Sequence, residues 1–209
     1  MKKLFLMGAL LLAGLGVLYT FRSQPAYTNF PPQKGKVWVA FGDSLTSGYG
    51  ASDGHDYPAQ LSQRLRFPIL NLGAPGQTSQ DALGRVDEVL RVNPGVVLLC
   101  FGGNDTLNQV PASETFHNLA EVIDRLQAGG AFVVLIGVHS ASVRDKYHAQ
   151  FKKLAQEKHA LFVPNILGGV LGNPGLMSDY VHPNDEGYSV IAARLEKTLQ
   201  PLLPQLAPN

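Results

Sequence analysis

Short apolar runs alternate along the chain with longer amphipathic stretches, and this alternation is the first structural signal in the sequence. The apolar runs lie at 37–41, 69–72, 96–101, 132–138 and 161–163. They are almost continuously hydrophobic, as strands are when helices cover both faces of a parallel sheet. The pattern therefore predicts the strands of a buried, mostly parallel sheet.

The stretches between these runs carry apolar side chains at helical spacing. Helices are predicted at 58–66, 80–92, 114–128, 144–158 and 186–200. In the third of them, Phe116, Leu119 and Ile123 recur three or four residues apart and form one apolar stripe. Repeated strand and helix units make right-handed crossovers. We expect a doubly wound, flavodoxin-like α/β fold, with a mostly parallel five-stranded sheet and helices on both faces.

A separate apolar run precedes these elements. Lys2 and Lys3 are followed by uncharged residues from 4 to 21, which would span roughly 27 Å as a helix. We interpret residues 1–21 as an export signal or a membrane anchor. An uncleaved anchor is favoured over a cleaved signal because the apolar stretch exceeds the about 7 to 15 residues of a cleavable core. Leu15 stands where a lipoprotein signal requires cysteine, which excludes a lipid anchor.

Residues 22–35 contain three prolines, Pro25, Pro31 and Pro32, and are interpreted as a linker. The folded domain is then expected at 36–203. With the positive end of the leader in the cytoplasm, this domain would lie in the periplasm or on the outer face of the cytoplasmic membrane. We therefore expect an exported protein that is associated with the membrane through residues 4–21.

Composition and charge narrow the classes of function. The 17 Lys and Arg residues nearly balance the 16 Asp and Glu residues, which excludes binding to nucleic acid through bulk charge. With 45% hydrophobic and 16% charged residues, the 209-residue chain can bury the core of one domain. Cys100 is the single cysteine, and no CxxC or HExxH motif offers a zinc site. We predict no cofactor and no metal, and we expect a monomer.

Glycines and polar residues follow the predicted strands at the places where each strand ends. Residues 42–45, 73–76 and 102–105 follow the first three strands, and His139 follows the fourth. Ligands of open α/β sheets bind outside the carboxyl ends of the strands. A hydroxyl, a carboxylate and an imidazole could therefore meet at this edge of the sheet.

The residue types at this edge suit nucleophilic catalysis. A serine hydroxyl such as that of Ser44 needs an adjacent base, and histidine, with an ordinary pKa of about 6.5, suits that task. Asp179 lies three residues before His182 and could accept a hydrogen bond from its ring. The amides of Ser44, Gly73 and Asn104 could stabilise negative charge on a substrate oxygen. Each residue alone also suits a cap or a turn, but their joint occurrence favours catalysis.

These segments resemble the conserved blocks of the SGNH (GDSL) hydrolases. The blocks are FGDSLTSGYG with Ser44, NLGAPGQTS with Gly73, GGND with Asn104, and DYVHPND with Asp179 and His182, in the order of the family. The resemblance covers residues 36 to about 200 and is closest to the bacterial thioesterase I, lysophospholipase and arylesterase branch. It implies that Ser44 is the nucleophile, His182 the base and Asp179 its orienting partner. It also implies that Ser44, Gly73 and Asn104 form the oxyanion hole.

The expected activity is hydrolysis of an acyl ester, namely an aryl ester, a lysophospholipid or an acyl thioester, through an acyl-serine intermediate. An O-deacetylase of carbohydrate or peptidoglycan, and a non-catalytic binding module, remain as alternatives. The apolar character of 110–113 and 166–177 favours an acyl chain over a sugar, and His139 is a candidate substrate contact. The absence of a G-x-S-x-G elbow argues against the α/β-hydrolase fold.

Overall fold

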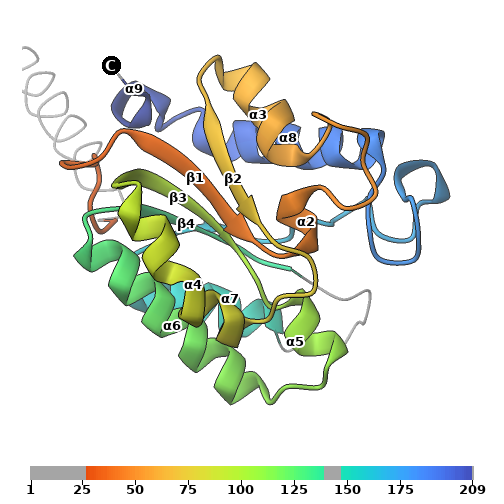
Figure 1. The fold of residues 1–209 in the computed structure, drawn as a ribbon, viewed down its shortest axis with the longest axis horizontal. Coiled ribbons are helices and arrows are strands. Elements are labelled where there is room, and N and C mark those ends of the chain that lie inside the picture. The colour runs from red at the N-terminus through yellow and green to blue at the C-terminus, as the bar shows by residue number, and fades with distance from the viewer. Residues whose placement is uncertain (1–26, 139–146, 209) are drawn as a thin grey trace, which may run out of the picture.

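The described part of the molecule is built on a five-stranded parallel sheet. The computed structural model describes residues 27–138 and 147–208. Every pair of neighbouring strands is parallel, in the order β2-β1-β3-β4-β5. The strands are β1 (Val37–Gly42), β2 (Ile69–Gly73), β3 (Pro94–Cys100), β4 (Phe132–Ile136) and β5 (Leu161–Val163). The predicted doubly wound sheet is confirmed (Figure 1).

Helices cover both faces of this sheet, as the continuous hydrophobicity of the strands predicted. On one face lie α3 (Tyr57–Leu65) and α8 (Asp185–Leu199) (Figure 1). The other face carries α4 (Ser79–Arg91), α6 (Ala112–Ala128) and α7 (Tyr147–Glu157). Successive strand residues point to opposite faces, so Trp38 joins the core under α3 and α8 while Val39 joins the core under α4 and α6. Two cores thus hold the strand ends in place.

Several short helices have no counterpart in the sequence prediction. They are α2 (Ser44–Ser47), α5 (Gly103–Leu107), α9 (Leu203–Leu206) and the 3₁₀ helix η1 (Pro174–Leu176). Helices of three to five residues show no hydrophobic period, because a period needs at least two turns to appear. The longer predicted helices are confirmed with ends shifted by one or two residues, except that the predicted start of 144–158 lies outside the described residues.

The strand order places two chain segments beside each other at the centre of the sheet. The chain passes from β1 outward to β2 and then returns to β3 on the other side of β1. This reversal is the switch point at which open α/β sheets bind ligands. α2 follows β1 directly and α5 follows β3, so Ser44 and Asn104 start from neighbouring strand ends.

The described part of the predicted linker is packed on the domain. The rings of Tyr27 and Phe30 lie 5.8 and 5.4 Å from the ring of Phe132. Asn29 Nδ2 also donates to two backbone carbonyls, at 2.8 and 3.0 Å. From Tyr27 onward, this segment is therefore attached to the body and is not a free spacer.

The folded domain extends beyond its predicted carboxyl-terminal limit. Trp38 Nε1 donates to the carbonyl of Leu206 at 3.2 Å, so packing continues past residue 203. Residues 1–26, including the predicted leader, lie outside the described residues. Within the described ranges, no helix has the length and apolar character needed to cross a bilayer.

Candidate active site

Ser44 begins the short helix α2, directly after the end of strand β1. The side chain of Asp43 caps α2 by accepting the backbone N–H of Leu45 at 3.0 Å. Gly42 is needed just before this helix, because a Cβ there would lie 2.0 Å from Thr46 Oγ1. The strand, the cap and the glycine together fix the direction of the Ser44 side chain.

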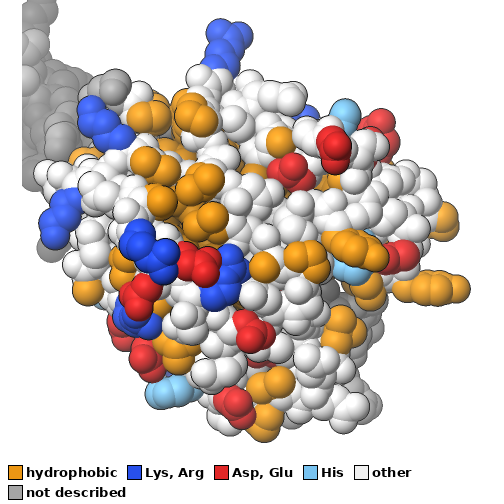
Figure 2. Space-filling model, viewed as in Figure 1, with side chains coloured by type: hydrophobic (Ala, Val, Ile, Leu, Met, Phe, Trp, Pro, Cys, Tyr) orange, Lys and Arg blue, Asp and Glu red, His pale blue; other side chains and the backbone are white. Residues whose placement is uncertain are grey.

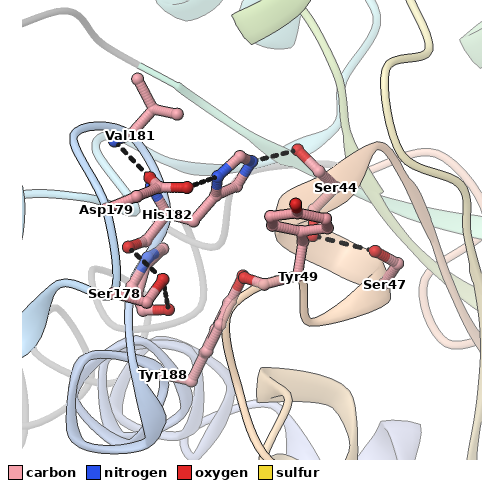
Figure 3. Close-up of polar contacts among 9 residues, drawn as sticks. Ser44, Ser47, Tyr49, Ser178, Asp179, Val181, His182 and Tyr188 are labelled. Carbon is pink, nitrogen blue, oxygen red and sulfur yellow. Dashed lines mark hydrogen bonds and ion pairs between the residues drawn. The ribbon is translucent and has the colours of Figure 1, made fainter.

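The loop before α8 brings an imidazole and a carboxylate to this serine (Figure 3). His182 Nε2 lies 3.0 Å from Ser44 Oγ, and His182 Nδ1 lies 2.8 Å from Asp179 Oδ2. Asp179 Oδ1 accepts the backbone N–H groups of Val181 and His182 at 2.8 and 2.7 Å. These bonds hold the carboxylate within its own loop. The three predicted residues therefore form one hydrogen-bonded chain.

The charge on Asp179 suits the role of partner to an imidazole. The hydrogen bond from the His182 ring, followed by the N–H of Val181, lowers the pKa of Asp179 to about 2. Asp179 is therefore ionised at neutral pH and can only accept hydrogen bonds. This fixes the proton of a neutral His182 on Nδ1 and leaves Nε2 free to accept the proton of Ser44.

Asn104 enters the site from α5, at the end of the neighbouring strand β3. Its Nδ2 donates to the carbonyl of Gln77 at 2.8 Å, which fixes the orientation of the amide. The second contact of Nδ2, to Asp43 Oδ2, is 3.5 Å long and is at the outer limit of a hydrogen bond. One N–H of Asn104 is therefore available to a substrate oxygen.

Gly73 differs from the prediction. Its N–H donates to Asn71 Oδ1 at 2.9 Å and is not available to a substrate oxygen. A Cβ at Gly73 would lie 2.2 Å from the backbone nitrogen of Ser47. Glycine is needed here because β2 packs closely against α2. The predicted role of Gly73 in the oxyanion hole is therefore replaced by a role in packing.

Gly76, three residues later, carries a second backbone N–H in this segment, which the sequence analysis did not consider. Its φ is +78°, and a Cβ built on it would meet open space. Its N–H makes no hydrogen bond to any residue in the described ranges. The carbonyl of the next residue, Gln77, is bonded to Asn104, so this turn lies beside that amide. The Pro75-Gly76 pair is typical of a type II turn, and this pair was the signal in the sequence that pointed to a turn at Gly76.

A cavity of about 390 Å³ opens beside Ser44, His182 and Asn104. Its wall is mainly apolar and is formed by Leu45, Leu107, Val138, Leu167, Leu171 and Val181. The segment 166–177 contributes two of these side chains, as predicted. The loop 110–113, which was also expected to contact the acyl chain, does not line the described cavity. Leu107 of α5 lines it instead.

One further site prediction concerns His139. His139 lies outside the described residues, and the preceding Val138 lines the cavity. Cys100 is fully buried in β3. No group of three or more His, Cys, Asp or Glu residues in the described ranges is arranged to hold a metal ion.

Comparison with known proteins decides the family. The model of the GDSL-like lipase/acylhydrolase family matches residues 40–190. The chain belongs to this family. It is therefore a hydrolase that acts on ester bonds, and the resemblance noted in the sequence is confirmed.

Individual relatives cover almost the whole GDSL hydrolase chain. Thioesterase 1/protease 1/lysophospholipase L1 of Escherichia coli K12 is 30% identical over 196 residues, which is 90% of each protein. The esterase TesA of Pseudomonas aeruginosa is 30% identical over 210 residues, covering 94% of this chain and all of the relative. A crystal structure of TesA matches with a TM-score of 0.74 and 28% identity, over 80% of this chain and 99% of that one. The fold of these enzymes is therefore shared.

Proposed function

We propose that this enzyme hydrolyses acyl esters or thioesters of short to medium chain length through an acyl-serine intermediate on Ser44. The observation that carries the proposal is the bonded chain from Ser44 through His182 to Asp179, which ends at an apolar cavity. A serine at the wall of such a cavity can meet the carbonyl carbon of an acyl group bound there.

The reaction proceeds in two halves. As Ser44 Oγ attacks the carbonyl carbon, His182 Nε2 takes its proton, and the ionised Asp179 stabilises the imidazolium. The tetrahedral intermediate then collapses, and His182 gives the proton to the departing alcohol or thiol. Water attacks the acyl-serine in the same way, with His182 again as the base, and releases the acid.

Negative charge on the former carbonyl oxygen is stabilised by hydrogen-bond donors. We assign this role to the backbone N–H of Ser44, the backbone N–H of Gly76 and Asn104 Nδ2. The first is at the start of α2, where a helical N–H has no partner within the helix. The other two belong to segments joined by the bond from Asn104 to Gln77. Such donors act most strongly when they are fixed before the charge develops.

The cavity sets the expected acyl group. Its volume of about 390 Å³ is near the small end of ligand pockets, and its apolar wall suits an alkyl chain better than a sugar. Each methylene buried there would contribute about 0.8 kcal/mol, or about fourfold in kcat/KM. The names of the relatives, thioesterase, lysophospholipase and esterase, support an acyl substrate.

We also propose that the protein is exported. This proposal rests on the apolar sequence from 4 to 21 and the two lysines before it. Tyr27 and Phe30 attach the chain to the domain shortly after this run, which would hold the body close to the point of anchorage.

A series of p-nitrophenyl esters, from acetate to palmitate, tests the function. We expect kcat/KM to rise by up to about fourfold per methylene and then to fall once the chain exceeds the cavity. Ser44→Ala should lower kcat by about 10⁴-fold or more on every ester. Equal rates for the wild type and Ser44→Ala would remove Ser44 from the mechanism. A preference for acetate, together with faster hydrolysis of acetylated glycans, would instead identify a deacetylase.

A further inference from the structure

The ring of Tyr49 lies against the imidazole of His182. The ring centroids are 4.5 Å apart and the ring planes make an angle of 49° (Figure 3). The hydroxyl of Tyr49 makes no hydrogen bond to any residue in the described ranges, and 54% of Tyr49 is exposed. The aromatic ring, and not the hydroxyl, is therefore the part of Tyr49 that contacts the site.

The backbone of Tyr49 is held from two directions. Its N–H donates to the carbonyl of Ser44 at 3.0 Å, so the turn that carries Ser44 also carries Tyr49. Its carbonyl accepts the hydroxyl of Tyr188, a buried residue of α8, at 2.9 Å. Gly48 and Gly50 flank Tyr49 with φ of +84° and +91° and allow the chain to bend on both sides of it.

The same bend brings the Tyr49 loop into close contact with the loop of His182. A Cβ at Gly50 would lie 2.1 Å from Ser178 Oγ and 2.9 Å from the carbonyl oxygen of Pro183. Ser178 Oγ in turn donates to the carbonyls of His182 and Pro183 at 3.1 and 3.3 Å. The two loops therefore fit together, and the position of the Tyr49 ring relative to His182 is fixed by backbone contacts.

An aromatic ring in this place has two physical effects on an imidazole. It limits rotation of the imidazole, so that Nε2 stays directed at Ser44 Oγ at 3.0 Å. Its electron-rich face also attracts a cation, and His182 becomes a cation when it takes the proton of Ser44. The second effect is absent before the reaction and present in the transition state.

We propose that Tyr49 is a positioning residue for His182, which it orients and whose positive charge its ring stabilises during proton transfer. This inference rests on the proposed function, because it requires His182 to act as the base. Tyr49 does not line the described cavity, so its removal should change the rate of the chemical step and not substrate binding.

Three substitutions at Tyr49 test the inference with p-nitrophenyl butyrate. Tyr49→Ala should lower kcat by about two- to fivefold with KM unchanged, the factor expected for an exposed cation–π contact. Tyr49→Phe keeps the ring and should retain the wild-type kcat. Tyr49→Leu keeps apolar bulk that can limit rotation of the imidazole but has no aromatic face, so its kcat should lie below that of Tyr49→Phe and no lower than that of Tyr49→Ala. Thermal melting of each variant, followed by circular dichroism, shows whether it is folded at the assay temperature.

Several results would overturn the inference. A kcat for Tyr49→Leu equal to that of Tyr49→Phe would show that bulk alone matters, and a changed KM with constant kcat would show contact with substrate. If Tyr49→Ala does not fold, the kcat of Tyr49→Phe is compared with that of Tyr49→Leu, and equal values overturn the inference. Ser44→Ala in the same assay separates the two proposals. An active Ser44→Ala overturns the proposed function, whereas an inactive Ser44→Ala with a fully active Tyr49→Ala overturns only the role of Tyr49.

Discussion

Two aspartates lie next to the reacting groups of this hydrolase in opposite environments. Asp43 precedes Ser44 and is 2% exposed, whereas the side chain of Asp179 beside His182 is 42% exposed. Burial, with a smaller contribution from the charge of Asp105, raises the pKa of Asp43 to about 7. The hydrogen bond from His182 instead lowers the pKa of Asp179 to about 2.

The comparison shows that environment, and not distance along the chain, sets the role of each carboxyl group. Asp43 is adjacent to the nucleophile, but its bonds cap α2 and its burial opposes ionisation. Asp179 is 135 positions away from Ser44 in the printed numbering, yet it is the carboxylate that stays charged and bonds to the imidazole. On the face that Figure 2 shows, acidic and basic side chains are mixed.

Substitution of Asp179 should have the largest effect. Asp179→Asn keeps the size of the side chain but loses the charge that stabilises the imidazolium and can favour the wrong tautomer of His182. We expect kcat to fall by about 10³- to 10⁴-fold. The melting temperature should change little, because the side chain is exposed. Ester hydrolysis and thermal melting measure the two quantities. A loss of less than about tenfold would mean that another group orients His182.

Asp43→Asn is the matched change at the buried carboxyl group. The amide oxygen can still accept the N–H of Leu45, so the loss of kcat should stay below about tenfold. A much larger loss, close to that of Asp179→Asn, would contradict the distinction between the two residues.

The same variant has a distinct effect on the pH dependence of stability. Between pH 4 and 7, the folded wild type retains a proton on Asp43 that the unfolded chain has released, since the folded pKa is about 7. The free energy of unfolding therefore decreases as pH rises through this window. Asp43→Asn removes this contribution, so its stability should rise relative to the wild type from pH 4 to pH 7. Urea denaturation at several pH values measures this difference. If the free energy of unfolding had the same pH dependence in the wild type and in Asp43→Asn, the raised pKa of Asp43 would be contradicted.

Much of the site could be predicted from the sequence, because its chemistry lies at strand ends. Ser44, Asn104 and His182 are distinctive residue types that follow buried strands or precede α8, and a parallel sheet brings strand ends together. The fold follows from the same pattern, since almost continuous apolar runs require cover on both faces.

What the sequence missed depends on contacts within and between loops. Gly73 ends β2 and Gly76 lies in the turn that follows it, and only the placed side chain of Asn71 shows that the N–H of Gly73 is already bonded. Tyr49 stands in a recognised block, but its contact with His182 joins segments that are far apart in the chain. In the segment 22–35 the prolines suggested a linker, while Tyr27 supplied an aromatic ring that packs on the core.

The central claim is that His182 and Asp179 make the hydroxyl of Ser44 the reactive nucleophile. Labelling with a fluorophosphonate, followed by peptide mapping in a mass spectrometer, tests it most directly. The account predicts one adduct, on the peptide that contains Ser44, with labelling absent in Ser44→Ala and strongly slowed in His182→Ala. An adduct on a different residue, or equal labelling of Ser44→Ala, would contradict it.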